Sequence, residues 1–152
     1  MKHGKIIATE ADKQGLTVNV RWADEIGNTP VVSFFLRNLA QLIDMGHSTQ
    51  MISGANKHRA VYIEYNNQVI GHIVFDMLEP PVKTAWIVLS AIDPAYKRRG
   101  LYTILHNHFE RIVKEMGAKK IASFVHVDNT ARQRSCEQVG MAPVYLRMEK
   151  DL

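Results

Sequence analysis

The sequence has little cysteine, no long apolar run and no secretory leader pattern. Its single cysteine, Cys136, excludes an internal disulfide, and chains without disulfides are typical of reducing compartments. No run approaches the roughly 18 apolar residues of a membrane span, and the initial MKHGKIIATE lacks the apolar core of a signal peptide. We therefore expect a cytoplasmic protein without membrane association.

The chain has the size and composition of one folded domain. Of its 152 residues, 46% are hydrophobic and 22% are charged, which excludes a disordered or collagen-like chain. This length suffices for a buried core but is short for two ordinary domains. We predict a single domain over residues 1–152, without repeats.

Positive charge is concentrated in one segment. Residues 97–134 hold nine Lys and Arg against three Asp and Glu, whereas the rest of the chain holds 10 against 12. A local surplus of this kind suits a polyanionic ligand, either a phosphorylated cofactor or nucleic acid.

Hydrophobic periodicity in the first half predicts strands around one helix. KIIATE and LTVNVRW flank a turn at Gly15, and Thr29 and Pro30 are good residues for the start of a helix that ends at Gly46. Residues 60–65 and 68–77 read as a hairpin around two asparagines, and TAWIVLSAI is typical of a strand covered on both faces.

The second half alternates helices and strands. After Gly100 an apolar stripe with a period near 3.6 predicts a helix that ends at Gly117. The strand KIASFVHV, a helix over 129–139 and a last strand, PVYLRME, complete the chain. The order of elements predicts an α/β (α+β) fold with a mixed sheet, rather than a pure Rossmann winding.

The turn before the second long helix suits an anion. The segment IDPAYKRRGLYTIL places Lys97, Arg98 and Arg99 against Gly100 at the helix N-terminus, where unpaired N–H groups and the helix dipole attract phosphate. Taken alone, this glycine is more often a plain turn and such cations are more often solvated. The motif therefore needs support from its surroundings.

That support comes from a family resemblance. Ile92-Asp93-Pro94 and the run from Lys97 to Tyr102 resemble the hydrophobic-x-Pro and R/Q-x-x-G-x-G/A signature of the GNAT superfamily of N-acetyltransferases. Asn129, followed eleven residues later by Gly140 and Met141, fits a second feature of the family. The resemblance extends from about residue 86 to 141. It implies a mostly antiparallel central sheet flanked by helices, with the strand pair at the N-terminus.

The resemblance also implies a function and a cofactor. It implies transfer of an acetyl group from acetyl-CoA to a primary amine by direct attack, without a metal. Contacts with coenzyme A are expected from one strand, the turn and a later asparagine: Ser90, Ile92, Lys97, Arg98, Arg99, Gly100, Leu101, Tyr102, Thr103 and Asn129. The N–H of Ile92 would stabilise the oxyanion. Asn129 has a second interpretation, because Asn is a favoured helix N-cap.

Three positions depart from the family pattern. Lys97 stands in place of Arg or Gln and keeps the charge. Tyr102 stands where a small residue is usual, so its side chain must lean away from the phosphates. Cys136 occupies the position of the Tyr that protonates the departing thiolate in many members. Cys136 is a candidate acid, although a buried cysteine that only packs is the commoner case.

The sequence offers several candidates for the general base and does not choose among them. His126 lies near the end of the strand that precedes Asn129, and histidine is the usual side chain for proton transfer near neutral pH, while Glu64 and Asp76 are alternatives on the central hairpin. A strand histidine is more often a surface residue than a base. His106 and His108 diverge around a helix, so we expect no metal site.

Two other functions remain as alternatives. A non-catalytic acyl-CoA sensor would explain the missing tyrosine, and a basic nucleic-acid-binding module would explain the sequence pI of about 9.3. Nucleic acid is disfavoured, because no aromatic stacking pair or recognition helix is apparent.

The partners follow from the same resemblance. The acceptor is a small-molecule or protein amine, read by the loop over 46–58 and the first helix. The acidic remainder of the chain favours a cationic amine such as a polyamine, aminoglycoside or lysine side chain. The last segment, PVYLRMEKDL, is a candidate for pairing in a homodimer.

Overall fold

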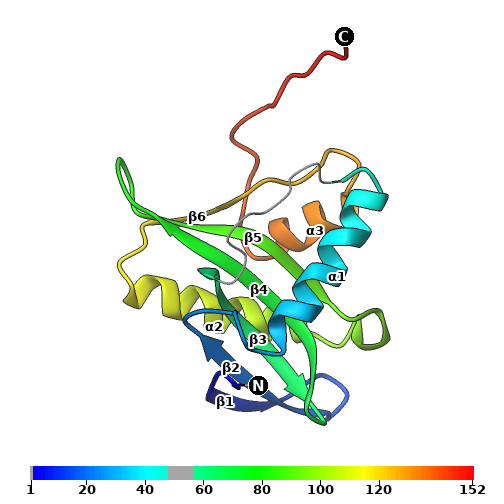
Figure 1. Cartoon of the computed structure of the whole chain (residues 1–152), viewed down its shortest axis with the longest axis vertical. Helices are drawn as coiled ribbons and strands as arrows, with labels where there is room; N and C mark the ends of the chain where they lie inside the picture. The colour runs from blue at the N-terminus through cyan, green and yellow to red at the C-terminus, as the bar shows by residue number, and fades with distance from the viewer. Residues whose placement is uncertain (1, 48–56) are drawn as a thin grey trace.

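The protein is an open, twisted sheet between helices. We describe it from a computed structural model, which defines residues 2–47 and 57–152. Within these residues the strands are β1 (Lys5–Ala11), β2 (Thr17–Ala23), β3 (Arg59–Tyr65), β4 (Gln68–Leu78), β5 (Thr84–Ile92) and β6 (Lys120–Ser123). The helices are α1 (Val31–Asp44), α2 (Leu101–Glu115) and α3 (Thr130–Gln138). The expected mixed, mostly antiparallel α/β fold is confirmed (Figure 1).

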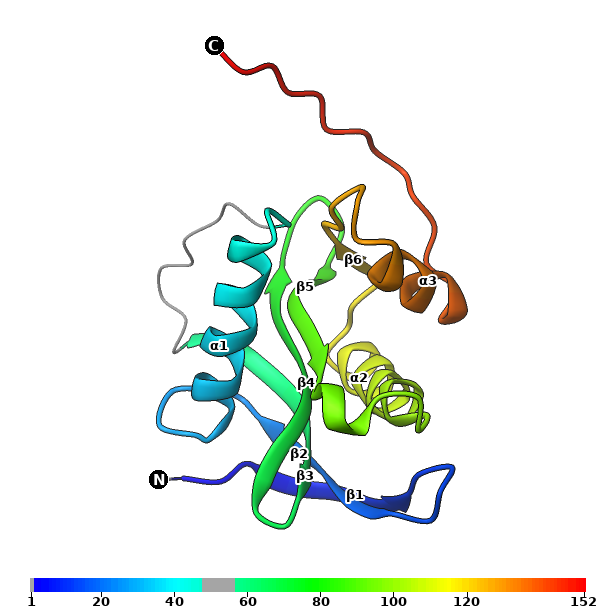
Figure 2. The same ribbon diagram turned by 90° about the vertical axis from the view of Figure 1, so that its right-hand side faces the viewer.

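The strands follow one another across the sheet in chain order. Every neighbouring pair is antiparallel except β5 and β6, which run parallel and are joined by the crossover through α2. Figure 2 shows α1 on one side of the sheet and α2 with α3 on the other. Both faces of the central strands are therefore buried.

The local signals in the sequence explain the turns. Asn66 and Asn67 both have positive φ, 48° and 59°, and join β3 to β4 as a tight hairpin. At the start of α1, the Thr29 hydroxyl accepts the Val31 N–H at 3.3 Å, with Pro30 between them. Small polar residues and proline form these turns because they tolerate or impose the backbone angles required.

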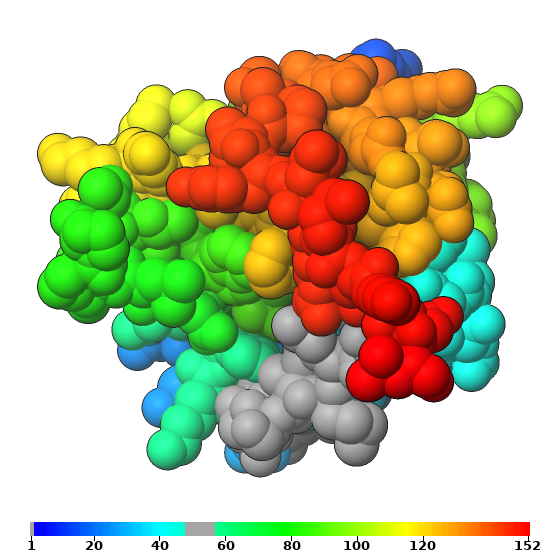
Figure 3. Space-filling model, turned by 90° about the horizontal axis from the view of Figure 1, so that it is seen from above, coloured from blue at the N-terminus to red at the C-terminus, as the bar shows by residue number. Residues whose placement is uncertain are grey.

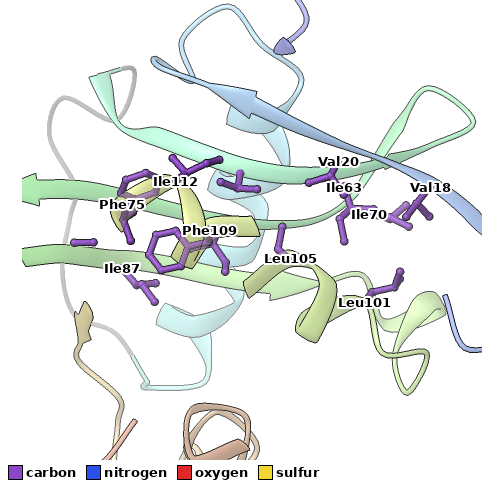
Figure 4. Packing of buried hydrophobic residues seen from close by; sticks show 14 residues of the cluster. Val18, Val20, Ile63, Ile70, Phe75, Ile87, Leu101, Leu105, Phe109 and Ile112 are labelled. Atoms are coloured by element: carbon purple, nitrogen blue, oxygen red, sulfur yellow. The ribbon is translucent and has the colours of Figure 1, made fainter. Parts of the chain in front are cut away.

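The core under α2 holds the sheet and this helix together. The apolar stripe of α2 is buried as its periodicity predicts, and the Phe109 ring lies 5.0 Å from that of Phe75 on β4. Figure 4 shows this stripe against side chains of β2 to β5. Truncating a fully buried Phe to Ala typically costs about 3–5 kcal/mol. The N-terminus of α2 is therefore rigidly placed.

The core under α1 contains an unusual polar residue. His72 of β4 is fully buried against Phe34 and Phe35, and neither ring nitrogen has a hydrogen-bond partner within residues 2–47 and 57–152. Burial lowers the pKa of His72 to about 4, because a charged ring would lose its hydration. The imidazole is neutral at pH 7.

The end of the chain differs from the sequence prediction. No strand forms over residues 141–152, so the prediction of a last strand at PVYLRME is wrong for this structure. The backbone leaves α3 at Gly140 and projects from the body (Figures 1 and 2), with Val144, Leu146 and Met148 exposed. An alternating pattern forms a strand only where an edge is available for pairing, and this tail has no paired strand among the described residues.

Candidate active site

The turn between β5 and α2 is built to leave backbone donors free. After a short 3-10 helix over Pro94–Tyr96, Arg98 and Gly100 both have positive φ, 61° and 77°. Gly100 is the N-cap of α2 and supplies no side-chain cap. The first N–H groups of the helix therefore lack a capping side chain, which is the arrangement that binds anions.

A hairpin from the far edge of the sheet holds this turn. The side chain of Asp12, between β1 and β2, is fully buried and accepts hydrogen bonds from Arg99 and from the N–H groups of Gln14 and Leu16. The Lys13 N–H donates to the Arg99 carbonyl at 3.0 Å. The Arg99 guanidinium lowers the pKa of Asp12 below its usual range. Arg99 thus anchors the turn, and its side chain does not line the cavity described below.

Lys13 lies directly against the glycine of this turn. A Cβ placed on Gly100 would be 3.1 Å from Lys13 Cε. The exposed Lys13, together with Lys97 and Arg98, gives the turn three cationic side chains at the cavity. The hairpin therefore adds a cation that the turn sequence itself does not contain.

The two parallel strands separate beside the turn. β5 and β6 pair only between Thr84–Ile87 and Lys120–Ser123. The Ser123 hydroxyl then donates to the Ile87 carbonyl at 3.1 Å, and a register shift against β4 leaves Val88 as a bulge. Beyond this point the two strands diverge, and β6 is shorter than the predicted run to Val127. The separation opens the sheet.

The backbone of β5 faces this opening with free donors. The Asp93 N–H bonds to Ile70 of β4 at 2.8 Å. Because successive peptide groups of a strand point to opposite edges, the N–H groups of Ile92 and Ser90 point away from β4. They face the separated edge, where an extended amide chain could pair with them.

One large cavity joins the turn to the separated strands. Its volume is about 1270 Å³, and its walls come from α1, β5, the α2 N-terminus, residues 123–127 and α3. Figure 3 looks onto the end of the molecule where the C-terminal tail crosses from α3 toward α1, and Tyr145 to Arg147 of this tail also line the cavity. The cavity is larger than typical sites for drug-sized ligands.

The structure brings most predicted cofactor residues together. Those that line the cavity are Ser90, Ile92, Lys97, Arg98, Gly100, Leu101, Tyr102, Thr103 and Asn129. The Asn129 side chain caps α3 by accepting the Arg132 N–H at 3.2 Å. Asn129 is therefore both the helix cap and a wall residue.

Tyr102 is accommodated by a partner on α3. Arg132 donates to the Tyr102 hydroxyl at 2.6 Å, and its guanidinium carbon lies 5.5 Å from the ring centroid. The Tyr102 side chain thus leans toward α3, as its position beside the helix N-terminus requires. Arg132 lines the cavity as well, and sequence reasoning missed it because its role depends on a contact between two helices.

Cys136 does not lie where a proton donor for a ligand in the cavity would have to lie. It is 7% exposed and does not line the cavity, while its neighbour Ser135 does. Burial raises the pKa of the Cys136 thiol. This position fits the packing interpretation of the cysteine better than a role in proton donation.

Two stacked histidines form the other end of the cavity. The rings of His47 and His126 lie 5.2 Å apart at an interplanar angle of 17°. His126 Nδ1 accepts the Asp128 N–H at 3.1 Å, so the neutral ring carries its proton on Nε2. A base at His126 therefore requires the ring to reorient. His47 was missed because nothing in the sequence indicates this stacking.

The alternative bases are engaged elsewhere. Glu64 pairs with Arg21, and Asp76 pairs with His58 at 2.7 Å; neither lines the cavity. No group of three potential metal ligands exists within residues 2–47 and 57–152. No helix in these ranges is long and apolar enough to cross a membrane.

Comparisons with known proteins agree with this geometry. The sequence profile described as "Acetyltransferase (GNAT) family" matches residues 20–141. A search of curated proteins gave no match.

Solved structures share the fold at low identity. A putative acetyl transferase from Pyrococcus furiosus is 21% identical with a TM-score of 0.66, over 89% of this chain and 99% of that one. A ribosomal-protein-alanine N-acetyltransferase from Brucella melitensis biovar Abortus 2308 has 11% identity and a TM-score of 0.63, over 89% and 99%. Aminoglycoside N-acetyltransferase AAC(6')-Iy in complex with CoA has 15% identity and a TM-score of 0.62, over 88% of this chain and 98% of that one.

Proposed function

Because the chain belongs to the GNAT acetyltransferase family, we propose that it transfers the acetyl group of acetyl-CoA to a primary amine. The observation that carries the proposal is the continuous path from the uncapped N-terminus of α2 to the separated edge of β5, within one cavity. An anion site next to an unpaired strand edge suits a ligand with a diphosphate and an amide-containing arm.

The residues present fit acetyl-CoA. The N–H groups from Arg98 to Thr103 would bind the diphosphate, with Lys97 and Arg98 adding charge. The N–H groups of Ser90 and Ile92 would pair with the amides of the pantetheine arm. Asn129 would contribute a side-chain contact next to its capping bond. All of these residues line the cavity except Arg99, whose side chain instead pairs with Asp12 and anchors the turn.

We propose direct attack as the reaction. The neutral amine nitrogen forms the new C–N bond at the thioester carbonyl, the C–S bond breaks, and the sulfur leaves as thiolate. The Ile92 N–H would stabilise the oxyanion, an interaction typically worth ~10²-fold or more in rate. The proton lost by nitrogen would pass to His126 or through water to bulk solvent. The thiolate can leave unprotonated or take a proton from Cys136 if the thiol turns toward the cavity.

The position of Cys136 favours a second candidate function. A thiol outside the cavity is not placed to protonate the leaving group. If the thiolate does not leave unaided, the domain would be a sensor that binds acetyl-CoA without turnover. Nucleic-acid binding stays a weaker alternative, based on the basic segment alone.

One assay separates these functions. Purified protein is given acetyl-CoA and a mixture of primary amines, and free thiol is measured against a sample without amine. Amine-dependent thiol release supports the enzyme. Binding of acetyl-CoA without release identifies the sensor. Steeply salt-dependent binding to nucleic acid, without acetyl-CoA binding, would replace the proposal.

Partner and location remain proposals as well. We propose that the exposed tail over 142–152 pairs with a second copy in a homodimer in the cytoplasm, because its alternating apolar side chains have no partner strand in the described chain. Light scattering after size exclusion checks this, and a monomer would reject it. The loop expected to read the acceptor, 46–58, lies partly outside the described residues (48–56).

A further inference from the structure

The two ends of the cavity differ in charge. At the α2 end the wall carries four cationic side chains, those of Lys13, Lys97, Arg98 and Arg132. At the other end, α1 and residues 124–127 contribute no Lys, Arg, Asp or Glu to the wall, and the paired Arg147 and Glu149 of the tail add no net charge. Among the described wall residues the only carboxylate is Glu149, which lies in the exposed tail. The uncharged end is where an acceptor would meet the acyl group if the diphosphate lies at the cationic end.

The rest of the described chain supplies few carboxylates there. None of its other Asp and Glu residues lines the cavity, and some are held in pairs, such as Asp12 with Arg99 and Glu64 with Arg21. Asp128 is exposed and lies outside the wall, but its carboxylate is 3.8 Å from His126 Nδ1. The sequence of residues 48–56 contains no Asp or Glu. A polyamine or aminoglycoside would therefore bring several positive charges to a site where the described residues offer only the carboxylates of Asp128 and Glu149.

The same end offers apolar and aromatic surface. Trp86 and Phe124 form an edge-to-face pair with centroids 4.8 Å apart, and Phe124 is 65% exposed. Leu42 and Met45 of α1 also line this end. Aromatic and thioether side chains bind apolar ligand surface and adapt to its shape.

We propose that the acceptor is a small amine with a single positive charge and an aromatic or aliphatic body. The body would pack on Trp86, Phe124 and Met45, and the amine would face the stacked histidines. This inference rests on the proposed function and narrows the expected cationic amine, because it excludes polyamines and aminoglycosides. Desolvation by an apolar wall favours the neutral form of an amine, which is the form that attacks a thioester.

The chemistry needs a proton acceptor at this end, and the geometry offers two. His47 lines the cavity and its buried Nδ1 has no hydrogen-bond partner among the described residues, while His126 Nδ1 is occupied by the Asp128 N–H. A neutral His47 ring with its proton on the buried Nδ1 has Nε2 as its acceptor, and Nε2 can take the proton that the amine loses. His47 is therefore the better placed of the two.

The test measures amine binding independently of turnover. Phenethylamine and spermidine are titrated by calorimetry into protein saturated with coenzyme A. We expect phenethylamine to bind about tenfold more tightly, because burying an aromatic group on this wall stabilises the complex. Tighter or equal binding of spermidine overturns the proposal, and so does the absence of binding by phenethylamine. Thiol release in parallel tests the proposed function, so the two failures are distinguishable.

Variants locate the effect. Phe124→Ala should weaken phenethylamine binding about tenfold while acetyl-CoA binding changes little, and Leu78→Ala, an exposed apolar residue off the cavity wall, serves as the matched control. Gln41→Glu places a carboxylate on the α1 wall and should raise the affinity for spermidine relative to phenethylamine. Gln68→Glu on the β3–β4 hairpin is its control. If Phe124→Ala leaves phenethylamine binding unchanged, the assignment of this wall is wrong.

Discussion

The two ends of the cavity are supported in opposite ways. The turn end is held by polar contacts, because the buried Asp12 binds Arg99 and a neighbouring N–H binds the Arg99 carbonyl. The α1 end rests on an apolar core, beside which the buried His72 has no hydrogen-bond partner in the described part of the chain. A site for a phosphorylated ligand needs hydrogen-bond donors held in fixed positions, whereas a site for the apolar part of a ligand needs apolar surface to pack against.

Because of this contrast, we expect the two ends of the cavity to respond differently to mutation and to pH. The turn end should respond to backbone and charge changes through ligand affinity. The α1 end should respond to pH through stability, since burial there opposes any charge. The following variants break one end at a time.

The largest expected effect concerns His72 beneath α1. Its folded-state pKa of about 4 lies below the usual 6.5, so the unfolded chain binds the proton first as the pH falls. Stability is therefore full above pH ~6.5 and falls by about 3 kcal/mol between pH ~6.5 and ~4. His72→Leu should remove this part of the pH dependence.

Urea unfolding at pH 8, 6 and 4 checks the His72 prediction. At pH 8 the imidazole is neutral in both states, so that measurement isolates the packing change in the variant. An undiminished pH dependence in His72→Leu would contradict the prediction.

The next effect concerns Gly100 at the turn end. Val at this position would combine a φ of 77° with a Cβ 3.1 Å from Lys13. Because the left-handed conformation costs roughly 1–2 kcal/mol for other residues, we expect the turn to shift and the affinity for acetyl-CoA to fall about 10- to 100-fold. Calorimetric titration measures it.

Gly140→Val is the matched control for Gly100. Gly140 has a φ of 85°, so a valine there would be strained to a similar degree as at Gly100. A Cβ placed on Gly140 would have no described neighbour within 4 Å, and Gly140 does not line the cavity. If both variants are folded and bind acetyl-CoA equally, the turn is not the phosphate site.

A smaller effect is expected for Lys13, which the sequence places far from the turn. Lys13→Ala removes one exposed cation, and such a contact is worth up to about 1 kcal/mol, so affinity should fall about fivefold. Lys5→Ala on β1, away from the cavity wall, should bind normally. Unchanged affinity in Lys13→Ala would show that the hairpin contributes no phosphate contact.

The smallest expected effect on stability concerns Asp12, which holds the turn through Arg99. The pKa of Asp12 is lowered mainly by its hydrogen bond with Arg99, so its contribution to stability is present above pH ~3.9 and is lost as the pH falls through the folded-state value. Asp12→Asn should therefore flatten the acid limb of the stability profile. Asp24→Asn, at an exposed pair with Arg59, should leave that limb unchanged; identical profiles for the two variants would refute the role of Asp12.

Local patterns in the sequence predicted most of the fold. The stripe of α2 and the asparagine hairpin depend on neighbours within a few residues, and both are confirmed. The turn at Gly100 was found because its residues are contiguous. The last strand was predicted wrongly, because strand formation depends on an available edge that the pattern does not contain.

The missed features depend on contacts between distant segments. Lys13 reaches the turn over more than 80 residues of chain, and Arg132 meets Tyr102 between two helices. The bulge at Val88 is a property of strand register rather than of residue type. The proposed acceptor also differs from the polyamine or aminoglycoside that composition favours, because a surplus of acidic residues does not say which surface carries them.

The central claim is that the cavity binds acetyl-CoA with its diphosphate at the α2 N-terminus. Calorimetric titration of the folded protein with acetyl-CoA, and separately with coenzyme A, tests it most directly. The account predicts one binding site per chain with micromolar affinity for both ligands. A folded sample that takes up neither ligand at moderate salt would contradict it.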